Sequence, residues 1–116
     1  FSGDKSDTLQ KVNLTVVSNS YCANTLKLHI HPTQMCTYAP GKDSCVSDSG
    51  GPLLWRNVRS GRFRLVGLVS FGLACATIAP AVNTRVTSFL AWIVSVTSGR
   101  RFFESDLCKD LYGTVF

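Results

Sequence analysis

The sequence predicts an all-β domain followed by one helix. Short apolar stretches recur at intervals near ten residues, a spacing typical of an antiparallel sandwich or barrel. Hydrophobic residues make up 45% of the 116 residues and charged residues 16%, as in globular proteins. The longest apolar runs are interrupted within about ten residues, whereas a membrane-spanning helix needs about 20. One domain with a modest core is therefore expected.

The first half of the chain contains two expected strands. Apolar and polar side chains alternate over residues 11–16, which predicts a half-buried strand whose apolar side chains, Val16 among them, face inward. Residues 19–24 predict a short turn or helix, and residues 35–38 a short strand. Residues 39–51 are rich in Gly, Ser and Asp, so an irregular loop is expected there.

The second half contains an expected hairpin. Two apolar stretches, residues 52–59 and 63–71, flank Ser60-Gly61, and a turn between two such stretches is typical of a hairpin. A further strand is expected over residues 81–86.

A short helix is expected near the C-terminus. Thr87 or Ser88 can cap its start, and Gly99 can end it. Its apolar face needs a partner surface. Residues 100–116 show no clear period, and no motif assigns them a role.

One motif carries recognisable chemistry: Ser47-Asp48-Ser49-Gly50-Gly51-Pro52. A serine hydroxyl is a nucleophile only when a base takes its proton. The two histidines of the chain, His29 and His31, are interpreted as surface residues. The motif taken alone is equally well interpreted as an ordinary turn, because Ser, Asp, Gly and Pro favour turns.

The five cysteines favour disulfides over a metal site. They form no Cys-x-x-Cys pair, and zinc sites use tightly spaced ligands. Two disulfides and one odd thiol in a secreted protein are expected. Asn13-Leu14-Thr15 is a glycosylation sequon, which agrees with secretion. No metal and no cofactor are expected.

The net charge is +5, and much of it lies around the expected hairpin turn, at Arg56, Arg59, Arg62 and Arg64. Such a cluster suits acidic glycans, nucleic acid or an anionic partner. A solvated hairpin tip is the favoured interpretation, since no aromatic interleaving or nucleic-acid motif accompanies the arginines. Neither a nucleic-acid nor a membrane partner is expected.

Three sequence blocks together resemble one family. Residues 42–54, 65–72 and 81–86 are similar to the C-terminal half of trypsin-like serine proteases of the chymotrypsin fold. The stretch from Leu9 to Cys22 is similar to secreted venom and haemolymph proteases of arthropods. The resemblance extends from Asp7 to Val96. It implies the second six-stranded antiparallel barrel of that fold without its first strand, together with the C-terminal helix. Residues 1–99 would form this partial protease domain, and residues 100–116 an extension.

The resemblance also implies a role for individual residues. Ser49 corresponds to the nucleophile, and the backbone N–H groups of Ser47 and Ser49 to the oxyanion hole. Asp48 corresponds to the partner of a new N-terminus after activation. Asp43 corresponds to the base of a pocket for Arg or Lys side chains. The implied substrate-binding residues are Asp43, Ser44, Ser70, Phe71, Gly72, Ala74 and Ala81. The implied disulfides are Cys22–Cys36 and Cys45–Cys75, with Cys108 left odd.

Five residues depart from the pattern of the family: Phe71 replaces a tryptophan, Trp55 replaces a cysteine found in many relatives, and three others affect the oxyanion loop or the pocket. Ser47 replaces a glycine of the oxyanion loop, where a serine costs about 1 kcal/mol or more if the backbone angles favour glycine. Ala74 and Ala81 replace glycines that line the pocket, so each added methyl narrows it.

The resemblance implies a secreted serine endopeptidase that cleaves proteins or peptides after Arg or Lys. The His and Asp of its triad would come from an N-terminal half, so this chain alone should be inactive. A catalytically inactive homologue that acts as a binding or regulatory module is the alternative. A basic glycan-binding module is a third interpretation.

Overall fold

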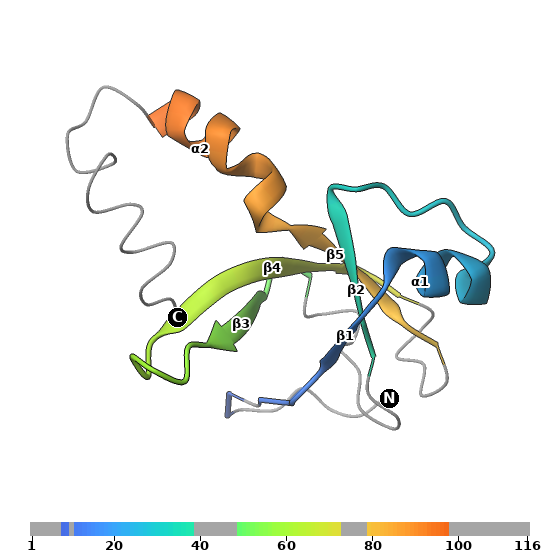
Figure 1. Ribbon diagram of the computed structural model, residues 1–116, viewed down its shortest axis with the longest axis horizontal. Helices are drawn as coiled ribbons and strands as arrows, with labels where there is room; N and C mark the ends of the chain where they lie inside the picture. The colour runs from blue at the N-terminus through green and yellow to red at the C-terminus, as the bar shows by residue number, and fades with distance from the viewer. Residues whose placement is uncertain (1–7, 10, 39–48, 73–78, 98–116) are drawn as a thin grey trace.

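A five-stranded antiparallel sheet forms the body of the molecule (Figure 1). The computed structural model describes residues 8–9, 11–38, 49–72 and 79–97. The elements in chain order are β1 (Thr15–Val17), α1 (Asn19–Leu26), β2 (Gln34–Tyr38), β3 (Pro52–Arg56), β4 (Phe63–Phe71), β5 (Ala81–Arg85), the 3-10 helix η1 (Val86–Phe89) and α2 (Leu90–Thr97). The expected hairpin and the strands near residues 35–38 and 81–86 are thus confirmed with small shifts at their ends, whereas the first strand, expected over residues 11–16, covers only Thr15–Val17.

The strands follow the order β1-β2-β5-β4-β3, and each neighbouring pair is antiparallel. Within the described ranges β1 and β3 are the two edges of this sheet, so it is open. The mainly β architecture is as expected. The closed six-stranded barrel stays a prediction, because five strands are paired here.

The helix α1 covers one face of the sheet beside β1 and β2 (Figure 1). Ser18 caps its start, since the Ser18 Oγ accepts a hydrogen bond from the Tyr21 N–H at 3.1 Å. Lys27 ends it in the left-handed conformation, at φ 56°. The turn or helix expected at residues 19–24 is therefore a helix that continues to Leu26.

A small apolar core lies between α1 and the sheet. It consists of Cys22, Ile30, Cys36 and Val82, with Val17, Ala23 and Leu26 packed against it. The prediction that Val16 faces inward is wrong: Val16 is exposed, and the neighbouring Val17 contacts the core. Side chains in a strand alternate between the two faces with a period of two residues, so a shift of one residue exchanges the buried and exposed side chains.

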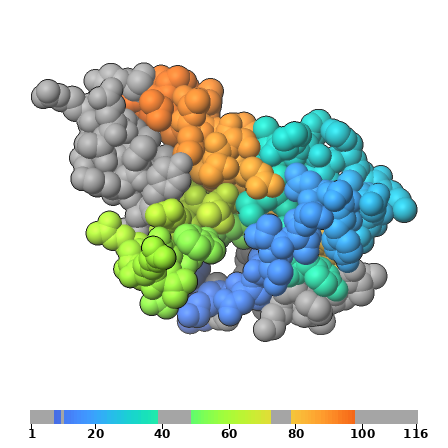
Figure 2. Space-filling view, viewed as in Figure 1, coloured from blue at the N-terminus to red at the C-terminus, as the bar shows by residue number. Residues whose placement is uncertain are grey.

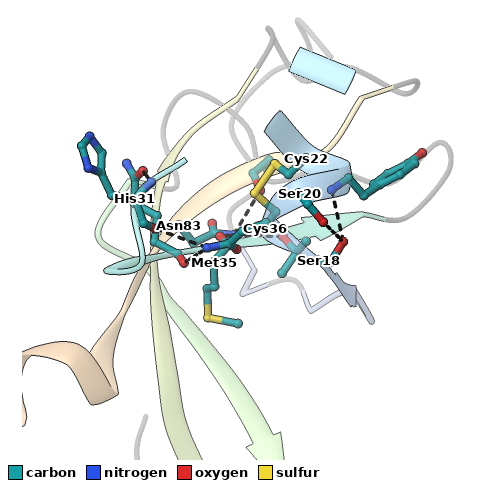
Figure 3. Close-up of a disulfide and its surroundings, with 12 residues drawn as sticks. Ser18, Ser20, Cys22, His31, Met35, Cys36 and Asn83 are labelled. Atoms are coloured by element: carbon teal, nitrogen blue, oxygen red, sulfur yellow. Dashed lines mark hydrogen bonds between the residues drawn. A yellow bond between two sulfur atoms is a disulfide. The ribbon is translucent and has the colours of Figure 1, made fainter. Parts of the chain in front are cut away.

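The Cys22–Cys36 disulfide joins α1 to β2 (Figure 3). Both cysteines are fully buried in the core. The pairing implied by the resemblance is confirmed, while Cys45, Cys75 and Cys108 lie outside the described residues.

Replacing Cys22 and Cys36 together with alanine is expected to lower the free energy of unfolding by about 3 kcal/mol or more. The bridge closes a loop over a sequence separation of 14, and loss of such a cross-link stabilises the unfolded chain by about this amount. Urea unfolding of oxidised protein and of the double variant measures the difference. A difference below about 1 kcal/mol would contradict a structural role for this bridge.

The opposite face of the sheet buries a polar pair. Asn83 in β5 is 1% exposed and Thr37 in β2 is 4% exposed. The Asn83 Nδ2 donates to the Thr37 Oγ1 at 3.0 Å and to the Met35 carbonyl at 3.3 Å (Figure 3). Packing here is tight, since a Cβ added at Gly67 would lie 3.0 Å from both the Met35 Sδ and the Leu53 Cδ1.

The helix α2 extends away from the sheet (Figure 1). The predicted cap at Thr87 or Ser88 is wrong, because both residues lie inside η1 and Arg85 precedes it without a side-chain cap. None of the α2 residues is buried, and Trp92 is 62% exposed. No helix in the described part of the chain has the length and apolar character needed to cross a membrane.

Candidate functional site

Ser49 lies on a turn that leads into β3. The next residue, Gly50, has a φ of +86°, which is the left-handed region that glycine adopts without strain. The Gly50 N–H donates to the Val69 carbonyl at 2.8 Å, and the Val69 N–H donates to the Gly51 carbonyl at 2.9 Å. These two bonds extend the β3–β4 ladder and hold Ser49 beside the end of β4.

The Ser49 hydroxyl contacts that strand end directly. Its Oγ donates to the Ser70 carbonyl at 3.3 Å, across 21 residues of sequence, and both residues are exposed. A peptide carbonyl accepts a hydrogen bond but is far too weak a base to take the hydroxyl proton. Ser49 is therefore positioned by the fold and is not activated by this contact.

Ser70 occupies an irregularity of β4. Val69 pairs with Asn83 and Phe71 pairs with Val82, so Ser70 is the extra residue of a β-bulge. Bulges bend a strand and often lie next to functional sites, where they redirect a side chain or a backbone group. Here the bulge places the Ser70 carbonyl toward Ser49 and leaves Phe71 47% exposed.

Gly72 and Ala81 lie against one another next to this bulge. A Cβ built at Gly72 would lie 3.3 Å from the Ala81 Cβ, and Ala81 is 4% exposed. The Ala81 methyl thus fills space next to Gly72. The structure brings together five residues predicted for the site: Ser49, Ser70, Phe71, Gly72 and Ala81.

The other predicted site residues lie outside the described residues. These are Asp43, Ser44, Cys45, Ser47, Asp48, Ala74 and Cys75. Asn13 of the sequon is described and is exposed.

The histidines lie apart from this arrangement. His29 and His31 precede β2, are exposed, and stack edge to face with ring centroids 4.5 Å apart. Within the described ranges neither ring is hydrogen-bonded to Ser49, whose hydroxyl contacts Ser70. Their interpretation as surface residues agrees with this exposure. The described part of the chain also contains no group of three potential metal ligands.

Comparison with known proteins identifies the family of this chain. The family model described as trypsin matches residues 1–93. The chain belongs to the trypsin family. It is 39% identical to a venom serine protease of Polistes dominula over 107 residues, which are 91% of this chain and 39% of that relative. It is 42% identical to venom serine protease 34 of Apis mellifera over 97 residues, 84% of this chain and 24% of that relative.

A clotting factor subunit is also similar to this trypsin-family chain. The clotting factor G beta subunit of Tachypleus tridentatus is 37% identical over 108 residues, 84% of this chain and 35% of that relative. The chain thus spans well under half the length of these relatives. The resemblance to arthropod serine proteases is confirmed.

Two features of the structure were not predicted from the sequence. One is the buried Asn83–Thr37 pair, which only the register of β2 against β5 brings together. The other is the contact between hairpin arginines and aromatic rings. Arg64 lies over Trp55 and Arg56 over Phe63, so the absence of aromatic interleaving inferred from the sequence is wrong. Both arginine–aromatic pairs depend on the register of β3 against β4, which the spacing of the residues alone does not give.

Proposed function

We propose that this chain is the C-terminal catalytic half of a secreted trypsin-like endopeptidase. Residues 1–99 form the partial protease domain, in which the five-stranded sheet is part of a six-stranded barrel. Residues 100–116 are an extension. An N-terminal half supplies the His and Asp of the triad.

The observation that carries this proposal is the contact between Ser49 and Ser70. A nucleophile must lie beside the strand that holds the peptide backbone of the substrate, so that the scissile carbonyl is within reach. The Ser49 hydroxyl lies 3.3 Å from the Ser70 carbonyl, at the exposed end of β4. Ser70, Phe71 and Gly72 are then the residues that bind the substrate backbone.

The reaction is acyl transfer. The imidazole of the N-terminal half takes the Ser49 proton while the Oγ forms a bond to the scissile carbonyl carbon. The N–H groups of Ser47 and Ser49 stabilise the resulting oxyanion. Collapse of this intermediate breaks the C–N bond, and the leaving amine receives the proton. Water then hydrolyses the acyl-enzyme by the same steps, and no metal or cofactor takes part.

Activation and specificity involve carboxylates of the loop that precedes Ser49. Asp48 pairs with the new N-terminus formed on activation. Asp43, with Ser44, forms the base of the pocket and selects Arg or Lys by charge and hydrogen bonding. Ala74 and Ala81 line the same pocket.

Secretion is supported by the Cys22–Cys36 disulfide, because disulfides persist mainly in oxidising compartments. For a secreted chain we also propose a second disulfide bridge, Cys45–Cys75, and a glycan on Asn13. The exposed position of Asn13 supports modification there.

A second candidate function is a binding or regulatory module without catalysis. It is favoured by the position of the Ala81 methyl, which lies against Gly72 and reduces the width of the proposed pocket. The substitution of Ser47 in the oxyanion loop favours it as well.

Hydrolysis of a set of peptide anilides distinguishes the two functions. The chain assembled with its N-terminal half is expected to cleave after Arg or Lys, whereas the chain alone should show negligible turnover. Cleavage after Ala or Phe only would retain the protease and contradict the basic specificity. The absence of turnover with every substrate would favour the binding module.

Replacing Ala81 with glycine is expected to raise kcat/KM for an arginine anilide by roughly 10-fold or more. The variant removes the methyl next to Gly72, and one methyl group in a specificity pocket is worth about 1–3 kcal/mol. The matched control is Ala23→Gly, in α1. An unchanged ratio of arginine to alanine anilide hydrolysis would place Ala81 outside the pocket.

A further inference from the structure

The β3–β4 hairpin concentrates positive charge. Arg56, Arg59, Arg62 and Arg64 lie within nine residues, and residues 49–72 contain no Asp or Glu. Arg56, Arg59 and Arg62 are exposed. The hairpin forms one side of the molecule and is yellow-green in Figure 2. A cluster of this kind attracts polyanions, since the positive potential is not offset within the segment.

The two arginines in the strands each lie over an aromatic ring. Trp55 pairs with Arg64 and Arg56 with Phe63 in the register of the hairpin. The Arg64 guanidinium carbon lies 5.8 Å from the Trp55 ring centroid, and that of Arg56 lies 6.0 Å from the Phe63 centroid. Consecutive residues of a strand point to opposite faces, so each face of the hairpin carries one arginine–aromatic pair.

The turn that carries the other two arginines is held by its own hydrogen bonds. The Asn57 Oδ1 accepts from the Arg59 N–H at 2.9 Å, and the Asn57 N–H donates to the Arg62 carbonyl at 2.8 Å. Gly61, at φ +70°, lets the chain reverse, and the Arg56 side chain lies close to it. Ordering of the backbone before binding reduces the entropy lost on association.

We propose that this hairpin binds a sulfated polysaccharide through Arg56, Arg59 and Arg62. The planar guanidinium group matches paired oxygens of an oxyanion better than an ammonium does, and every cation of the hairpin is an arginine. The arginines surround the tip on both faces, which suits a linear, flexible polyanion. The surface is separate from the Ser49 site, and its function is independent of proteolysis.

Two other polyanions fit the observations less well. Single-stranded nucleic acid binds through bases stacked on aromatic faces, whereas here one face of each ring is covered by a guanidinium. Insertion into an anionic membrane requires an apolar face. Among the described tip residues 57–62, Val58 is the only large apolar side chain, and the exposed rings of Trp55 and Phe63 each lie beneath an arginine.

The test compares two variants of equal charge by their binding to heparin. R59Q/R62Q and K11Q/K27Q each lower the net charge from +5 to +3, and all four side chains are exposed. For the full chain, titrations over a series of salt concentrations are expected to show Kd raised about tenfold or more by R59Q/R62Q. The slope of log K against log salt should fall by about 2. K11Q/K27Q should stay within about threefold of the parent chain, and equal losses in both variants would overturn the proposal.

Further measurements identify the ligand chemistry. Heparosan, which has a related backbone with carboxylates and no sulfate, is expected to bind at least tenfold more weakly than heparin. Tighter binding to duplex DNA or to phosphatidylserine vesicles than to heparin at the same salt would overturn the assignment. If R59Q/R62Q does not fold, R59K/R62K replaces it. That variant should keep the salt slope and weaken Kd a few-fold, whereas an unchanged Kd would contradict recognition by the guanidinium groups.

Discussion

Replacing Ser49 with alanine is expected to lower kcat of the assembled protease by about 10⁶-fold. The substitution removes the atom that forms the acyl bond, and loss of a triad nucleophile has an effect of this size. The KM should change little, because the hydroxyl contributes to the transition state and not to ground-state binding. Steady-state hydrolysis of an arginine anilide, with single-turnover kinetics for the slow variant, measures both quantities.

The matched control for this prediction is Ser20→Ala. Ser20 is an exposed residue of α1 whose hydroxyl contacts the Ser18 hydroxyl at 3.3 Å. Its loss should leave kcat within about twofold, since exposed helix positions tolerate alanine. A Ser49→Ala variant that retains more than about one hundredth of the parent kcat would contradict the assignment of the nucleophile.

Replacing Asn83 with aspartate is expected to lower the free energy of unfolding by about 3–5 kcal/mol at pH 7. The Asn83 Nδ2 donates to the Met35 carbonyl, the Thr37 Oγ1 and the Ala81 carbonyl. In the variant a carboxylate oxygen would face the two carbonyl acceptors in a site that is 1% exposed, and of the three partner groups only the Thr37 hydroxyl could turn to donate to it. Burial of a charge with so few donors is among the most destabilising changes in a protein core. Urea unfolding measures the difference.

The loss in the Asn83→Asp variant should depend on pH. Burial raises the folded-state pKa of the introduced carboxyl above its unfolded value of about 3.9. Below that value both states are protonated, and the part of the penalty that comes from ionisation vanishes. The penalty grows as pH rises from about 4 toward the folded-state pKa and is constant above it. The difference from the parent chain should therefore shrink when unfolding is measured at pH 4.5 and at pH 4.

Asn57→Asp provides the matched control for the Asn83 variant. The Asn57 Oδ1 accepts from the N–H groups of Arg59 and Ser60, and a carboxylate accepts these bonds at least as well. This variant should be within about 0.5 kcal/mol of the parent or more stable. Equal destabilisation by the two variants would contradict the burial of Asn83 among acceptors.

The sequence predicts the strands well where local patterns decide them. The hairpin over residues 52–71 follows from two apolar stretches around Ser60-Gly61, and the structure places β3 and β4 there. The first strand is less well predicted, because Val17 and not Val16 packs on the core. Its inward face depends on pairing with β2, which local alternation does not encode.

The candidate site could not be predicted from local sequence patterns, because it depends on contacts between residues far apart in the chain. Ser49 and Ser70 are 21 residues apart in sequence, and their contact depends on the ladder between β3 and β4 and on the bulge at Ser70. The family resemblance predicted this proximity, whereas composition and periodicity did not. The Asn83–Thr37 pair was missed because Asn83 lies in a strand and a polar residue there predicts exposure.

The contacts of the hairpin arginines were also not predictable from the sequence. Their charge is evident in the sequence, but their contacts depend on which residues pair across the two strands. The registers Trp55–Arg64 and Arg56–Phe63 place each cation on a ring. A bulge between Leu53 and Leu54 shifts the register just before these pairs, and such a shift is not readable from spacing alone.

Labelling with a fluorophosphonate probe tests the central claim most directly. The probe forms a covalent bond only with a serine whose hydroxyl is activated by a base. With the N-terminal half bound, we expect one adduct per chain, located on Ser49 by peptide mapping, and we expect almost no adduct with the chain alone. An adduct on another serine, or the absence of any adduct in the assembled protein, would contradict a catalytic role for Ser49.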